Sequence, residues 1–197
     1  TMVETESFAR HAARGDRRLG RLRELLRHPR ELATVAGLTM GGTLAFYTFT
    51  VYMQKFLVNT VGFAKDMATL VSAASLVGFM LLQPVVGALS DRIGRRPILI
   101  AFGVAGTLGT VPLMSRLQAA QGPWEALALI LLALAVVSGY SSINAVVKAE
   151  LFPVEVRALG VGLPYAITVS LFGGTAEYIA LWFKQAGNES GFYWYVT

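Results

Sequence analysis

The sequence of 197 residues contains no cysteine, which excludes disulfide bonds and metal sites built on thiolates. Charged residues are also scarce, because Asp, Glu, Lys and Arg together make up 15% of the chain, whereas soluble domains carry roughly 25%. In contrast, 54% of the residues are hydrophobic and the mean hydropathy is +0.55. Despite a formal net charge of +5, this composition predicts a membrane protein rather than a soluble nucleic-acid-binding protein.

Signatures of ordinary enzymes are missing as well. No glycine-rich phosphate loop followed by Lys-Ser or Lys-Thr occurs. His11 and His28 lie in the basic N-terminal segment without a carboxylate cluster, so the sequence indicates neither a metal site nor a Ser-His-Asp arrangement. We therefore expect a protein that is not an enzyme and that needs no metal or cofactor. The first thirty residues are polar and arginine-rich, and we expect no cleavable signal peptide there.

Long uncharged runs dominate the remainder of the sequence. A bilayer core about 30 Å thick needs about 20 helical residues, and five runs are long enough. Because the runs lack an alternation of period two, they predict helices rather than the strands of a β-barrel. The expected spans are residues 32–55, 67–90, 97–116, 125–147 and 157–183, with the start of a sixth at 190–197.

The placement of basic residues predicts the orientation of these spans. Short connections force neighbouring helices to run antiparallel, so one side collects thirteen Lys and Arg residues and the other collects four. Positive charge accumulates on the cytoplasmic side, which places residues 1–31 in the cytoplasm and residues 32–197 in a transmembrane bundle. Within the first segment, residues 17–28 favour an amphipathic helix on the inner membrane surface, although a plain basic flank explains the arginines equally well.

A charged motif occupies the gap between the second and third runs. Gly87 would let a neighbouring helix approach, Gly94 would permit a tight turn, and Asp91 would accept hydrogen bonds from a helix N-terminus or an arginine. The arginines can pair with carboxylates or lipid phosphates. A helix cap on a positive-inside turn is the alternative, but it does not explain both glycines. The motif consists of Gly87, Asp91, Arg92, Gly94, Arg95 and Arg96.

This motif, set between two apolar runs, resembles the cytoplasmic loop motif of the major facilitator superfamily. Residues 46–60, 83–97, 148–166 and 172–181 resemble its metabolite:proton symporter branch. The resemblance implies an all-α polytopic membrane protein, namely the C-terminal six-helix half of a twelve-helix fold, with the last helix truncated and the N-terminal half absent from this chain. It further implies a multi-pass protein of the bacterial inner membrane.

The resemblance also implies a function. The complete protein would be a proton-coupled symporter of a dicarboxylate such as α-ketoglutarate, working by alternating access, with a small organic acid and protons as its partners. Two alternatives stay open. The cargo can be another organic acid or an osmolyte, for instance shikimate, citrate, proline or betaine, or the chain can be a membrane scaffold that does not transport.

A dicarboxylate in a low-dielectric cavity needs cationic or hydrogen-bonding partners. Lys55 is a candidate for a substrate carboxylate, with a lysine at the membrane interface as the alternative. The spacing of seven lets Tyr47 and Gln54 share one helix face, and Tyr52 fits that face less closely. The expected substrate-binding residues are Tyr47, Tyr52, Gln54, Lys55, Asn144 and Tyr165.

Acidic residues supply the other two expected roles. Glu177 is the one carboxylate inside an otherwise apolar run, and we expect it either to carry the coupled proton or to make a structural hydrogen bond. At the inner face, Glu150 or Glu155 is expected to pair with Arg95 or Arg96 and so to form a gate. Glu150, Glu155 and Arg157 therefore join the loop motif in the expected gate.

Overall fold

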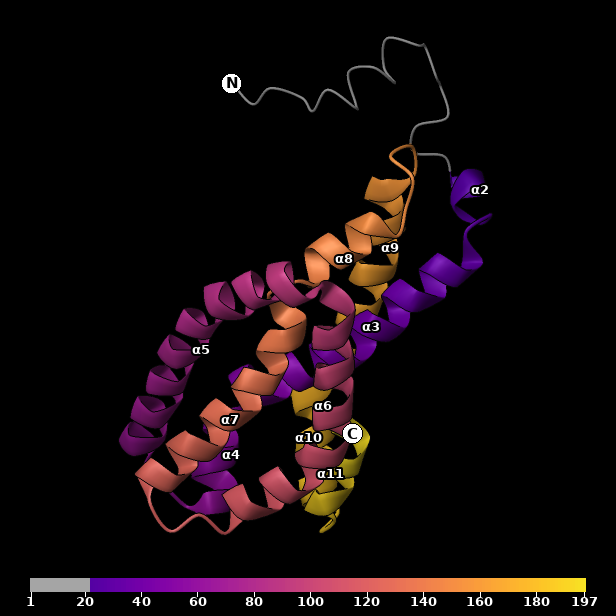
Figure 1. Ribbon diagram of the computed structural model, residues 1–197. Helices are drawn as coiled ribbons and strands as arrows, with labels where there is room; N and C mark the ends of the chain where they lie inside the picture. Colours follow the sequence, from indigo (N-terminus) through magenta and orange to yellow (C-terminus); the bar gives the residue numbers. More distant parts are fainter. Residues whose placement is uncertain (1–21) are drawn as a thin grey trace, which may run out of the picture.

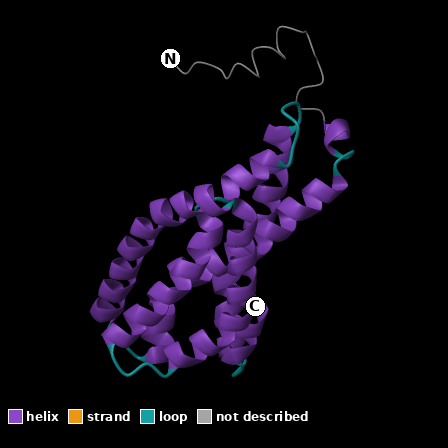
Figure 2. Cartoon of the chain, in the orientation of Figure 1, coloured by secondary structure: helices purple, strands orange, loops and turns teal. Residues whose placement is uncertain are grey.

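The computed structural model describes residues 22–197, and within this range every regular element is helical (Figure 2). Three of the elements are π-helical and carry the label η. In chain order the elements are α2 (Leu22–Leu25), α3 (Pro29–Tyr47), η1 (Thr48–Tyr52), α4 (Met53–Phe56), η2 (Leu57–Val61), α5 (Lys65–Ile93), α6 (Arg95–Gln118), α7 (Pro123–Ser141), α8 (Asn144–Glu150), α9 (Arg157–Thr168), η3 (Val169–Gly173), α10 (Ala176–Gln185) and α11 (Glu189–Val196).

Within the described residues, five helical runs are long and apolar enough to cross a membrane. Each expected span lies inside one of them, and α11 begins where the sixth run was expected. The all-α fold class predicted from the sequence is thus confirmed. The five runs are Pro29–Val61, Lys65–Ile93, Arg95–Gln118, Pro123–Glu150 and Arg157–Gln185.

Short connections make successive spans antiparallel. Figure 1 shows α2, the α5–α6 turn and the α8–α9 connection in the upper half of the view, and the η2–α5, α6–α7 and α10–α11 connections at the bottom. The first group is the side that the basic residues predict to be cytoplasmic. We call this end of the bundle the inner end and the opposite end the outer end.

Helix α7 lies at the centre of the packing, in contact with α3, α5 and α6, while α3 also packs against α9 and η3. Apolar side chains from these helices form one large buried core, and a smaller cluster of Leu25, Val35, Phe152 and Val156 sits at the inner end. In contrast, large apolar side chains of α5 and α6 such as Leu70, Met80 and Leu108 stay more than half exposed. Such faces suit hydrocarbon or a further helix rather than water.

Segment η1 is a π-helical turn that interrupts the first span, and two of its threonine hydroxyls bond to the preceding turn. Thr48 and Thr50 donate side-chain hydrogen bonds of 2.8 Å and 2.6 Å to the carbonyls of Leu44 and Phe46, four residues earlier. Such back-bonding loosens the regular ladder, and π-helical turns hold an extra residue and often mark functional sites. Residue spacing along this span therefore no longer follows an ordinary α-helix.

The expected amphipathic helix over residues 17–28 lies largely outside the described residues. Helix α2 covers its end, and there Leu25 is buried against Val35 and Phe152, whereas Leu26 is 73% exposed. In the described part of this segment the two leucines therefore do not share one face, as an amphipathic helix continued over residues 25–26 would require. The chain turns between α2 and α3, and this turn sends them in different directions.

Candidate transport site

At the inner end, Gly94 makes the sharp turn between α5 and α6. Its backbone has φ +92° and ψ 161°, a region almost restricted to glycine, and it both ends α5 and precedes the first residue of α6. Its amide donates a hydrogen bond of 2.9 Å to the carbonyl of Ser90. The predicted tight turn is thus confirmed.

Replacing Gly94 with alanine should destabilise this turn. A Cβ at φ +92° introduces backbone strain, of the order of 1–3 kcal/mol. We expect a lower midpoint of thermal unfolding in detergent than for wild type. Gly103→Ala is the matched control, because it lies mid-helix in α6 and no atom of residues 22–197 lies within 4 Å of the added Cβ. Equal midpoints for the two variants would contradict the prediction.

Two other expectations for the loop motif are wrong for the described half. Asp91 lies within α5, exposed, and makes no hydrogen bond or ion pair with any residue of the range 22–197. A Cβ built on Gly87 would meet no described atom within 4 Å, so no helix of this half approaches it closely. Helix α5 continues to Ile93. Gly87 and Asp91 therefore lie within this helix and not at its junction with α6.

An ion pair connects the loop motif to the second inner connection. Arg95 Nε lies 3.3 Å from Glu150 Oε1, at the end of α8. Arg157 Nε donates a hydrogen bond of 3.2 Å to the carbonyl of Phe152, and Glu155 lies half-buried in the turn between them. Arg92 and Arg96 make no hydrogen bond or ion pair within the described part of the chain. Among the residues expected to form a gate, Arg95 and Glu150 are paired.

Exchanging the charges of Arg95 and Glu150 tests this contact. Their side chains are 36% and 57% exposed, and exposed pairs contribute roughly 0.2–1 kcal/mol. We expect Arg95→Glu and Glu150→Arg each to change the transport rate of the full-length protein by about 1.5- to fivefold. The double exchange should restore the wild-type rate. A double variant no better than the two singles would show that the pair has no part in transport.

Near the outer end, Lys55 and Glu177 form an ion pair through Lys55 Nζ and Glu177 Oε1. Lys55 belongs to α4 in the first span and Glu177 to α10 in the last of the five. Each of these helices follows a π-helical segment, η1 and η3, and η1 packs against α10. The sequence assigned these residues to separate tasks, but the fold makes them partners that neutralise each other.

The other candidates of the first span point to three different neighbours. Tyr47 packs on Gly173, whose added Cβ would lie 2.9 Å from the Tyr47 ring. Tyr52 is 2% exposed, with its ring centroid 5.4 Å from that of Phe192. Gln54 donates a hydrogen bond of 2.8 Å to a threonine of α5. The prediction that they share one face is wrong, because the wider turn of η1 rotates the later residues of the span about the helix axis.

The remaining two candidates, Asn144 and Tyr165, meet at a lysine that the sequence analysis did not select. Lys148 is 1% exposed. Its ammonium donates hydrogen bonds of 2.9 Å to the hydroxyl of Tyr140 and 3.3 Å to Asn144 Oδ1, and it lies 4.7 Å from the centre of the Tyr165 ring. It forms no ion pair with any acid of the described residues. We call these four residues the lysine site.

A break in the fourth span creates the lysine site. Helix α7 ends at Ser141, two turn residues come next, and α8 starts at Asn144. The side-chain amide of Asn144 donates a hydrogen bond of 2.9 Å to the carbonyl of Ser141, and the Ser141 hydroxyl donates one of 2.9 Å to Gln83 of α5. Broken helices with polar groups at their ends are typical of binding sites inside transporters.

The sequence did hold a signal for this site. Asn144 and Tyr140 precede Lys148 by four and eight residues, a spacing that keeps all three near one face of a helix. Lys148 directly succeeds the uncharged run, so the pattern assigns it to the cytoplasmic connection. Only the folded structure, in which Lys148 is buried and bonded to Tyr140 and Asn144, shows that its side chain points into the protein.

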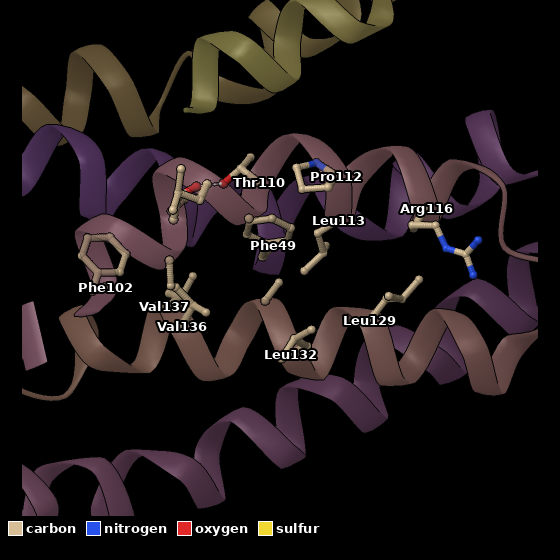
Figure 3. A pocket seen from close by; sticks show the side chains of 16 residues that line it. Phe49, Phe102, Thr110, Pro112, Leu113, Arg116, Leu129, Leu132, Val136 and Val137 are labelled. Atoms are coloured by element: carbon tan, nitrogen blue, oxygen red, sulfur yellow. Dashed lines mark hydrogen bonds between the residues drawn. The ribbon is translucent and has the colours of Figure 1, made fainter. Parts of the chain in front are cut away.

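A separate cavity of about 520 Å³ lies between α6, α7 and the first span (Figure 3). Its walls are apolar except for Thr110 and Arg116. The Thr110 hydroxyl donates a hydrogen bond to the carbonyl of Gly106, and Arg116 lies 3.5 Å from Glu125. Because its polar groups are already partnered, this cavity is a poor match for a charged molecule.

Comparison with known proteins identifies the family. The model of the Major Facilitator Superfamily matches residues 13–183. The chain belongs to the Major Facilitator Superfamily. Within this superfamily it is 47% identical over 194 residues to the alpha-ketoglutarate permease of Escherichia coli K12, covering 98% of this chain and 45% of the relative. The resemblance inferred from the loop motif is thus confirmed.

Other members of the superfamily are also similar. The ectoine/proline transporter of Corynebacterium glutamicum is 34% identical over 85% of this chain and 33% of its own length. The citrate-proton symporter of Klebsiella pneumoniae is 30% identical over 74% of the chain and 33% of its own length. No solved structure gives a significant match. The chain spans less than half the length of these relatives.

Family membership and the five apolar helices together establish a multi-pass membrane protein. The relatives are named as a permease, a transporter and a symporter, which are transport proteins and not enzymes. The expectation that this chain is not an enzyme is thereby confirmed.

Proposed function

We propose that this chain is the C-terminal half of a proton-coupled transporter of an organic dicarboxylate such as α-ketoglutarate. A second six-helix half completes the cargo cavity, and the cavity opens alternately to the two sides of the bacterial inner membrane. Residues 1–31 form the cytoplasmic segment between the halves, and residues 32–197 form the transmembrane bundle. The 47% identical relative, named alpha-ketoglutarate permease, supports this cargo.

The observation that carries the proposal is the unbalanced positive charge of Lys148. Lys55 and Glu177 cancel each other, whereas Lys148 is buried with no acidic partner among the described residues. An uncompensated charge inside a membrane protein costs several kcal/mol, about 2.5–3.5 on insertion scales. An anion bound in the cargo cavity between the two halves offsets this cost. An anionic cargo therefore explains why Lys148 is buried without an acidic partner.

Ionic contacts at the two ends of the bundle supply the elements of alternating access. Arg95 and Glu150 connect inner ends of helices, and Lys55 and Glu177 connect two spans nearer the outer end. Such contacts bias a two-state equilibrium when they exist in one state only. Protonation of Glu177 would release Lys55, and this step couples proton entry to the conformational change.

Counterflow in proteoliposomes tests the proposed function. The natural full-length protein is reconstituted, the vesicles are loaded with unlabelled α-ketoglutarate, and entry of labelled α-ketoglutarate is measured over time. We expect labelled α-ketoglutarate to accumulate transiently, and an inwardly directed proton gradient to drive net uptake. Exchange of betaine or proline in place of the acid would assign the chain to the osmolyte transporters, as the 34% identical relative suggests. No exchange of any solute would favour a scaffold.

A further inference from the structure

We propose that the lysine site binds one carboxylate group of the cargo, and that the ring of Tyr165 covers the Lys148 ammonium until the carboxylate displaces it. This inference rests on the proposed function and makes it specific. The site lies where the broken fourth span meets α9, and it combines residues of three helices. Lys148 acts as the cargo-binding cation, with Tyr140 and Asn144 as positioning residues.

The hydrogen bonds of Lys148 leave one donor for a ligand. An ammonium has three N–H groups. The hydroxyl of Tyr140 accepts one at 2.9 Å and Asn144 Oδ1 accepts another at 3.3 Å. No third acceptor lies within hydrogen-bonding distance among the described residues. A carboxylate oxygen can accept the remaining N–H as a charge-assisted hydrogen bond, which is stronger than a neutral one.

The Tyr165 ring occupies the position next to that free donor. Its centre lies 4.7 Å from Lys148 Nζ, a distance typical of a cation–π contact. Tyr165 is 44% exposed, whereas Lys148 is 1% exposed, so of these two contacting side chains the ring is the one that reaches the surface of this half. Such a contact partly compensates the buried charge while the site is empty. A carboxylate compensates the buried charge of Lys148 more fully than the ring does. This difference in free energy favours displacement of the Tyr165 ring by the carboxylate.

The second tyrosine is fixed in place and does not move with the first. The ring of Tyr140 is 4% exposed and lies against Gly42 and Phe102. Its hydroxyl therefore holds Lys148 in a fixed place, whereas the Tyr165 ring is 44% exposed and less tightly packed. The ammonium also lies 5.2 Å from the centre of the Tyr140 ring, but that ring is buried and packed, so the movable cover is assigned to Tyr165.

Selective acetylation of lysines tests the cover. The purified full-length protein in detergent is treated with an amine-reactive acetylating reagent, and modification of Lys148 is measured by peptide mass spectrometry relative to exposed Lys65. We expect Lys148 to react slowly in wild type and about tenfold faster in Tyr165→Leu, which removes the ring. Tyr165→Phe keeps the ring and should match wild type. Equal labelling in all three proteins would overturn the proposed cover.

Binding of the carboxylate is tested by counterflow of labelled α-ketoglutarate. Lys148→Met removes the charge but keeps much of the side-chain length, and we expect the half-saturation concentration to rise by about 30-fold or more. Lys148→Arg should retain part of the affinity. An unchanged half-saturation concentration in Lys148→Met would overturn the carboxylate site while leaving the proposed function intact. If wild type exchanges no organic acid, the proposed function itself fails.

Loss of cargo binding in a variant is meaningful only if that variant still folds. The thermal unfolding midpoint of each variant is measured in the same detergent. If Lys148→Met does not fold, Tyr165→Leu decides the question. Its half-saturation concentration should fall about tenfold, because the ring no longer competes with the carboxylate. An unchanged or raised value would contradict the displacement.

Discussion

Gly42→Ala is expected to reduce α-ketoglutarate exchange by about tenfold or more, since overpacking a core typically costs about 1–3 kcal/mol. The added Cβ would lie 2.3 Å from Cε1 and Cζ of the Tyr140 ring, far inside van der Waals contact. That ring cannot retreat easily, because it is 4% exposed and its centroid lies 5.5 Å from that of Phe102. Its displacement would take the hydroxyl away from Lys148.

Gly41→Ala is the matched control for this substitution. The two glycines are neighbours in α3, yet a Cβ on Gly41 would meet no atom of the described residues within 4 Å. Alanine is also a better helix former than glycine by about 1 kcal/mol. Gly41→Ala should therefore exchange α-ketoglutarate as wild type does, with an equal or higher unfolding midpoint. Equal exchange rates for both variants would show that the contact of Tyr140 with α3 has no bearing on the lysine site.

Glu177→Gln is expected to separate proton-driven uptake from exchange. Glutamine cannot take up a proton, and its neutral side chain leaves Lys55 without an acidic partner within the described helices. We expect proton-gradient-driven accumulation of α-ketoglutarate to fall by about tenfold, a change equivalent to about 1.4 kcal/mol. Counterflow, which needs no net proton movement, should stay close to wild type. Both activities are measured in the same proteoliposomes.

Two further variants show whether Glu177 acts through charge pairing or through protonation. Glu125→Gln also removes an acid from an ion pair, that of Arg116 between α6 and α7, and should leave both activities unchanged. Lys55→Gln combined with Glu177→Gln removes both charges. If the double variant regains proton-driven uptake, pairing alone matters and the proton is carried elsewhere. If the double variant regains the wild-type unfolding midpoint but not proton-driven uptake, Glu177 carries the proton.

Much of the fold was predictable because it depends on local properties of the chain. Each expected span lies inside one helical run, since the length of an uncharged apolar stretch fixes where a chain can cross a bilayer. The turn at Gly94 was predictable for the same reason, because a glycine between two such stretches allows a backbone that other residues avoid. The family was recognisable from the residues around that turn.

The partners of the polar side chains depended on contacts between distant segments. Lys55 and Glu177 are 122 residues apart, and two helices must pack together before the pair can form. The π-helical segment η1 altered the angular spacing on which the predicted common face relied. Asp91 and Gly87 were expected to make contacts that no helix of the described half provides.

The sequence alone determined that this chain forms helices long and apolar enough to cross a membrane, because hydrophobicity and backbone freedom are properties of single residues and short segments. Only the tertiary structure decided which charges are balanced. Lys148 is buried beside the Tyr140 ring, which packs against Gly42, and its ammonium lies 4.7 Å from the centre of the Tyr165 ring. The energy of a buried charge depends on every group around it, and those groups come from helices that meet only after folding.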